Sequence, residues 1–114
     1  MKLHFDEELK ELKNLLLKMA ILVEEIIAKA VTALLQRNAP LAYEIIKADK
    51  KINQLEVEID EMAHQLIARR QPIAHDLRLI TMMLKINATL ERVGDHAVNI
   101  AEKAVMIKEG ANVH

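Results

Sequence analysis

The fold of this chain is decided by the stretch from residue 71 to residue 95, which reads QPIAHDLRLITMMLKINATLERVGD. Pro72 has a fixed φ and no N–H, so it fits best in the first turn of a helix, where that donor would have no partner. From Pro72 to Leu90 apolar residues recur at helical spacing, and Glu91 and Asp95 then place two acids one turn apart on one face. The stretch predicts a long helix that begins near Pro72 and carries a carboxylate pair beside its apolar stripe.

Composition bounds the kind of protein. The 114 residues suffice for one domain, spanning 1–114, with a modest core. No cysteine is present, which excludes a disulfide or thiolate metal site and favours an intracellular location. The net charge of -1 does not favour a nucleic-acid partner. No segment approaches the roughly 20 apolar residues of a membrane span, and the N-terminus has no apolar signal region. We therefore expect a single cytoplasmic domain.

Apolar periodicity predicts an all-α protein. Apolar or small residues recur in steps of three and four along three segments, so we expect helices over residues 6–36, 40–69 and 72–108, followed by a frayed tail at 111–114. The seams of the first two segments are Phe5, Leu9, Leu12, Leu16, Met19, Val23, Ile26, Ala30 and Ala33, and then Ile45, Ala48, Ile52, Leu55, Ile59, Met62 and Leu66. The third segment has two stripes and must contact both other helices. This pattern predicts an antiparallel three-helix bundle.

The turns of this bundle determine which polar groups meet. If the second and third helices fold back near Gln71, the level of Asp49 and Asn53 meets that of Glu91 and Asp95. Folding about Ala39 brings residues 24 and 25, both glutamates, to the same level. Oxygen ligands without cysteine or a histidine pair suit a hard cation such as iron, manganese, magnesium or calcium. Acid pairs of this spacing also occur on solvated helix surfaces, so both interpretations stay open.

Two further groups of polar residues do not make up a complete metal or catalytic site. Glu61 and His64 have the Glu-x-x-His spacing of di-iron bundles, but such a site needs a second copy of the motif, which is absent. His75 and His96 each stand next to an aspartate, yet the chain has no serine or cysteine that could act as a nucleophile. We therefore expect no enzymatic activity.

Gly94, which weakens a helix interior, is expected where a backbone or ligand approaches closely.

Three segments carry a resemblance to a known family. They read ADKKINQLE at residues 48–56, RRQPIAHDLR at residues 69–78 and LERVGD at residues 90–95. In order and separation they resemble the signature segments of the PhoU family of phosphate-uptake regulators. The resemblance implies a helical cytoplasmic protein that negatively regulates high-affinity phosphate uptake and connects a phosphate ABC transporter to a sensor histidine kinase. Such a protein meets the membrane only through the transporter.

The resemblance also implies a metal site. The metal motif of the family is an acid, three residues and a second acid, used in pairs to hold iron or other metal clusters on the bundle surface. It falls on Glu91 and Asp95, and on Asp49 and Asn53, where Asn53 departs from the acidic form and removes one charge. The implied cofactor is a metal ion, either an iron cluster or manganese, zinc or magnesium.

The length of the chain departs from the family pattern. Members usually contain two tandem three-helix repeats, whereas this chain holds one, either as a single-repeat protein or as an excised half. In both cases the wide apolar face of the first helix lacks a covalent neighbour, which predicts a homodimer. Two functions stay open at this point. One is a metal-binding regulatory adaptor that docks on the transporter or kinase, and the other is a purely structural helical interaction module whose acids are only solvated.

Overall fold

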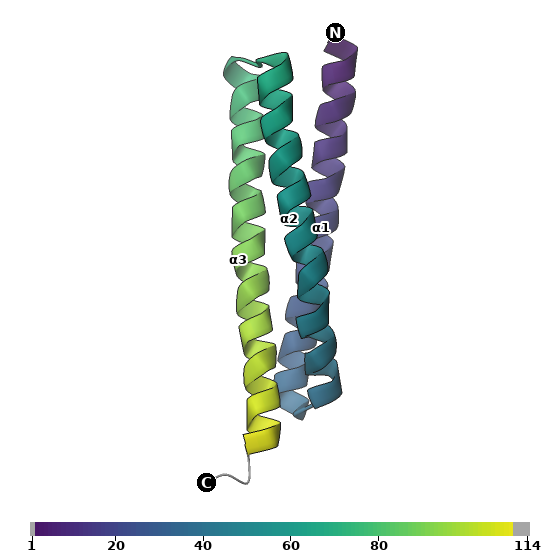
Figure 1. Ribbon diagram of the computed structural model, residues 1–114, viewed down its shortest axis with the longest axis vertical. Helices are drawn as coiled ribbons and strands as arrows, with labels where there is room; N and C mark the ends of the chain where they lie inside the picture. Colours follow the sequence, from purple (N-terminus) through teal and green to yellow (C-terminus); the bar gives the residue numbers. More distant parts are fainter. Residues whose placement is uncertain (1, 111–114) are drawn as a thin grey trace.

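The computed structural model describes residues 2–110, and the expected frayed tail at 111–114 lies outside them. It contains the helices α1 (Lys2–Gln36), α2 (Ala39–Arg70) and α3 (Ala74–Gly110), with no strand among the described residues. Consecutive helices run antiparallel and form a rod of 63 × 19 × 17 Å, in which each helix contacts the other two (Figure 1). The predicted all-α antiparallel three-helix bundle is confirmed.

A short reversal joins α1 to α2. Arg37 has a left-handed φ of 51°, and the N–H of Asn38 donates to the carbonyl oxygen of Ala33 at 2.9 Å, which is the bonding pattern of a Schellman cap. The Oδ1 of Asn38 accepts from the N–H of Leu41 at 3.1 Å, and Pro40 lies in the first turn of α2. One residue therefore closes α1 and caps α2, which starts one position before the expected boundary.

The connection from α2 to α3 corrects the predicted start of the third helix. Gln71 is left-handed (φ 47°, ψ 54°), and its N–H donates to the carbonyl oxygen of Ile67 at 2.9 Å. A residue before proline is disfavoured in the right-handed helical region, so α2 ends there and Pro72 belongs to the connection. The third helix begins at Ala74, and the prediction that it starts at Pro72 is wrong by two residues.

The first helix also begins earlier than expected, at Lys2 instead of Asp6. Its seam starts with Phe5, which is buried, and the helix must already be formed around Phe5 to present that ring to the core. Because α1 begins at Lys2, the acids that follow Phe5 lie beyond its first turn.

The core follows the predicted seams closely. Every seam residue of α1 from Phe5 to Ala33 is buried. On α2, Ala48 and Met62 are only half-buried, while Ala42 and Ala63 are buried in addition to the remaining seam residues. The buried residues of α3 come from both stripes and are Ile80, Met83, Asn87, Gly94, Ala97, Val98, Ala101 and Ala104. No helix within residues 2–110 combines the length and apolar character needed to cross a membrane.

Candidate functional site

Four carboxylates from two helices converge on one side of the bundle. Asp49 and Glu56 lie on α2, whereas Glu91 and Asp95 lie on α3. Asp95 acts electrostatically on Asp49, and Glu91 is influenced by Asp95, Glu56 and Asp49. We call these four residues the acidic face. The three predicted acids of the candidate site are thus brought together by the fold of α2 against α3.

Asp49 is the most constrained member of the acidic face. Its pKa is raised above the ordinary value, first because the carboxyl is partly buried and then because Asp95 and Glu102 add negative charge. The Nδ2 of Asn53 donates to its Oδ2 at 3.3 Å, which acts in the opposite direction. The other oxygen, Oδ1, is buried without a hydrogen-bond partner. A buried carboxylate oxygen with no hydrogen-bond donor is chemically able to accept a donor or a cation.

Glu91 is the second carboxyl of the acidic face whose pKa is raised. Its pKa is raised by burial, by a hydrogen bond with Asp95, and by the charges of Asp95, Glu56 and Asp49. Because these neighbours are all acids, a proton on Glu91 is held more firmly than in water. No ion pair among the described residues reaches any carboxylate of the acidic face. Within the described residues the negative charge of this surface is therefore not balanced by a direct ion pair.

Sequence reasoning missed two members of this environment. Glu56 shares one side of α2 with Asp49 and Asn53, as their spacing in the sequence indicates, but it is not among the predicted ligands. Glu102 follows Asp95 by seven residues, or about two helical turns, which also places both on one face. Helical phase on α2 and α3 was the signal that could have found them.

The expected contribution of α1 is not seen among the described residues. Glu24 and Glu25 are exposed, and neither is among the groups that shift Asp49 or Glu91. Glu25 instead lines a groove between α1 and α2 together with Lys29 and Lys51. The height predicted by counting along the bundle was therefore not enough to bring these acids to the acidic face.

Gly94 also differs from expectation. It lies between the two acids of α3 but is buried, and a Cβ built on it would lie 3.6 Å from two side-chain carbons of Ile52 and 3.9 Å from one of Val23. These are ordinary van der Waals distances. Gly94 therefore faces the apolar core, and the prediction that a close approach requires it is not supported.

The donor chemistry of the acidic face fits a cation, although the ligands are not assembled around one point. Hard cations prefer carboxylate oxygens, the four acids make no ion pair with any residue that the structure describes, and the Oδ1 of Asp49 has no hydrogen-bond partner. Within residues 2–110, however, no three acidic, histidine or cysteine side chains are grouped closely enough to hold a metal ion. The face supplies charge and ligand atoms, and a cation would require side-chain rotation to be enclosed.

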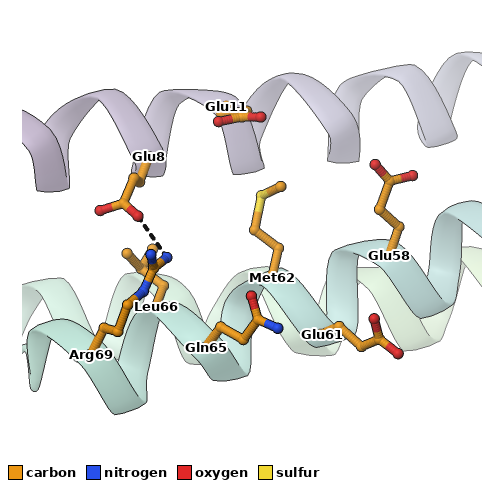
Figure 2. Close-up of a pocket in the computed structure, with 8 residues that line it drawn as sticks. All are labelled: Glu8, Glu11, Glu58, Glu61, Met62, Gln65, Leu66 and Arg69. Atoms are coloured by element: carbon orange, nitrogen blue, oxygen red, sulfur yellow. Dashed lines mark hydrogen bonds and ion pairs between the residues drawn. The ribbon is translucent and has the colours of Figure 1, made fainter.

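A second acidic groove lies between α1 and α2. Figure 2 shows Glu8, Glu11, Glu58 and Glu61 around Met62, Gln65 and Leu66, with Glu8 joined to Arg69. The Nη2 of Arg69 donates to Glu8 at 2.7 Å, so part of the charge of this groove is neutralised. His64 is engaged on its own helix, with Nδ1 placed 2.8 Å from the carbonyl oxygen of Asp60. The Glu61 and His64 pair has no facing ligand set among the described residues.

Comparison with known proteins gives consistent matches over nearly the whole bundle. A family model described as the PhoU domain matches residues 16–104. The phosphate-specific transport system accessory protein PhoU homolog of Aquifex aeolicus is 48% identical over 103 residues, covering 90% of this chain and 47% of the relative. The corresponding PhoU of Escherichia coli is 40% identical over 101 residues, covering 89% of this chain and 42% of the relative.

A solved structure supports the same match in three dimensions. The crystal structure of PhoU from Pseudomonas aeruginosa aligns with a TM-score of 0.90 at 42% identity, covering 92% of this chain and 50% of that one. The chain therefore spans about half the length of the relatives it matches.

Proposed function

Because the chain belongs to the PhoU family, we propose that it acts as a regulator of phosphate uptake. The observation that carries this proposal is the match of nearly the whole three-helix bundle to about half the length of proteins named accessory proteins of the phosphate-specific transport system. In this role the chain is a non-catalytic cytoplasmic adaptor. It docks on the phosphate ABC transporter, on a sensor histidine kinase, or on both, and represses uptake when phosphate is plentiful.

The regulatory role can be tested in a bacterium that lacks its own PhoU. The chain is produced there in phosphate-rich medium, and expression of the phosphate transporter is followed with a reporter gene. We expect repression of the reporter. Full reporter activity in cells that accumulate the folded chain would contradict the proposal, and binding to the purified transporter in lipid vesicles would then show whether docking or signalling had failed.

The acidic face is the proposed metal site of this adaptor. Asp49, Glu91 and Asp95 would supply carboxylate oxygens, and Asn53 would orient Asp49 through its hydrogen bond. Iron is the first candidate, with manganese, zinc or magnesium as alternatives. A bound cation would neutralise the acids of two helices and so tie α2 to α3. The uncompensated charge and the orphaned oxygen of Asp49 support this proposal.

Elemental analysis of the tag-free protein tests the metal site. The variant Glu91→Ala/Asp95→Ala is compared with Glu7→Ala/Glu11→Ala, a matched acid pair of the same spacing on α1. We expect stoichiometric metal in the natural chain and in the α1 variant, and its loss in the α3 variant. Absence of metal from the natural chain after reconstitution with each cation would refute the site and favour a docking module without metal.

A specific observation favours that alternative, a structural interaction module. Leu17, Ile21, Val31 and Leu35 of α1 are exposed at helical spacing, with Leu17 60% and Leu35 77% accessible. We call these four residues the apolar face. Beside it runs a groove of about 350 Å³ between α1 and α3, lined almost entirely by apolar side chains. Exposed apolar surface of this extent is typical of an interaction site.

We propose that a second copy of the chain covers the apolar face. The net charge of -1 imposes little repulsion between two copies, and a two-fold axis would let the same face pair with itself. Light scattering at micromolar concentration should give twice the chain mass for the natural protein and the chain mass for Leu17→Glu/Leu35→Glu. Val57→Glu, an exposed apolar position on α2, should remain dimeric. A monomeric natural chain would refute the dimer.

A further inference from the structure

Helix α3 presents two different stripes to its two neighbours. Leu79, Met83, Ile86 and Leu90 line the groove with α1. The second stripe, which contains Asn87, Glu91 and Gly94, faces α2. The Nδ2 of Asn87 donates to a backbone carbonyl oxygen of α2, and acids of α2 raise the pKa of Glu91. A Cβ built on Gly94 would lie nearest to Ile52 of α2. Neighbouring residues of a helix are about 100° apart, so these stripes define two directions around α3.

Either stripe could in principle face α2. Both contain enough apolar side chains to be buried, and a three-helix bundle of the opposite handedness would exchange their partners while keeping the same short connections. In that arrangement the wholly apolar stripe would contact α2, and Glu91 and Asp95 would turn towards α1. Hydrophobic burial alone therefore discriminates weakly between the two arrangements.

Asn87 breaks this symmetry. It is 2% exposed, and its Nδ2 donates to the backbone carbonyl oxygen of Glu56 on α2 at 3.0 Å. In the opposite arrangement the amide would leave this carbonyl and lie against the apolar seam of α1, where burial without partners is unfavourable. The hydrogen bond exists only when the stripe that carries Glu91 faces α2.

The stability of the bundle is not expected to depend on this amide. The Oδ1 of Asn87 is buried without a hydrogen-bond partner, so one half of the side chain is desolvated without compensation. An apolar side chain of similar volume would fill the same space without that penalty. A buried polar residue that contributes little stability can still select one packing among several, as polar core positions do in coiled coils.

We propose that Asn87 is a positioning residue, which selects the stripe of α3 that faces α2 and thereby holds Glu91 and Asp95 opposite Asp49 and Glu56. The assembly of the acidic face would then depend on a residue that is not itself a ligand. The consequence for metal binding rests on the proposed function, whereas the choice of packing does not.

The packing can be measured with spin labels, because the chain contains no cysteine of its own. Val57 on α2 and Thr89 on α3 are both exposed and are replaced by labelled cysteines. Asn87→Leu is then compared with Met83→Leu, a volume-conserving change at a buried position of the other stripe. In the opposite arrangement the side of α3 that meets α2 changes by about 100°, which would move a label on α3 by about 8 Å relative to α2, given a helix radius of about 5.5 Å with side chains.

We expect one narrow distance in the parent and in Met83→Leu, and a second or broadened distance in Asn87→Leu without a lower denaturation midpoint. An unchanged single distance in folded Asn87→Leu would overturn the proposal, and so would loss of folding, because the amide would then be needed for stability. Titration with manganese adds an independent readout, with affinity at least ten-fold weaker in Asn87→Leu. If the parent binds no metal, the metal site fails, while the label distance still decides the role of Asn87.

Discussion

Replacing Gly94 by alanine should stabilise the bundle, although this glycine stands between two candidate ligands. A glycine inside a helix is about 1 kcal/mol less favourable than alanine. The new methyl group would meet Ile52 at 3.6 Å and Val23 at 3.9 Å, so it would fill space in the core without displacing a neighbour. We therefore expect Gly94→Ala to raise the unfolding free energy by about 1 kcal/mol, which corresponds to a Tm increase of roughly 4–8 °C for a domain of this size.

Circular dichroism during thermal and urea denaturation measures this change. Ala88→Gly, at an exposed position of the same helix, serves as the control and should lose about 1 kcal/mol through helix propensity alone. All variants must be compared at one protein concentration, because a dimer makes the Tm depend on concentration. Destabilisation by Gly94→Ala would refute the reasoning, because it would mean that α2 approaches α3 more closely than the contacts to Ile52 indicate.

Three further perturbations test the acidic face and the helix ends. The pKa values of Asp49 and Glu91 are higher in the folded chain than their ordinary values of 3.8 and 4.5. The contribution of these two groups to folding stability is therefore fully present below the ordinary pKa values and is lost as the pH rises through the pKa values of the folded state. In urea titrations Asp49→Asn/Glu91→Gln should exceed the natural chain in stability at about pH 7, and this advantage should vanish towards about pH 4; an advantage independent of pH would contradict it. Arg37→Gly should add about 1 kcal/mol in urea denaturation, since φ is 51° there, while Arg37→Ala should not. Glu8→Gln should lower the unfolding free energy by about 1–2 kcal/mol, because the Glu8 carboxylate accepts from two arginines of α2 at 2.7 and 2.8 Å. This loss should shrink in high salt, and an undiminished loss would exclude an ionic origin.

The sequence predicts the helices of this protein better than their ends. Steps of three and four between apolar residues persist for about eight turns in α1, so few competing structures satisfy them. The ends depend on single-residue conformations instead. Arg37, Gln71 and Ala74 all have positive φ, although none is a glycine, and no composition rule identifies such positions in advance. The start expected at Pro72 failed for this reason.

The acidic face was predictable in part for a related reason. Helices α2 and α3 are antiparallel about a three-residue connection, so counting from Gln71 gives correct heights for Asp49, Glu91 and Asp95. Counting residues from the turn does not tell in which direction around the helix axis a side chain points. Glu24 therefore shifts the pKa of neither Asp49 nor Glu91, although counting predicts the same height for it, whereas Glu56 raises the pKa of Glu91. Rotation is fixed by packing between side chains, which periodicity describes only coarsely.

The departures from ordinary helix and core rules gather in one part of the molecule. Asn87 buries an unpaired oxygen, Glu91 has a carboxyl surrounded by acids, Gly94 weakens the helix where alanine would fit, and Asp49 faces them with a second orphaned oxygen. Each feature lowers stability, and all lie where α2 meets α3. The seam of α1, by contrast, is apolar throughout and buried. Local rules are expected to fail at functional sites, where other demands outweigh stability. These four departures lie within about two turns of α3 and the facing part of α2, so the substitutions at Asn87, Glu91, Gly94 and Asp49 test one region of the bundle from several directions.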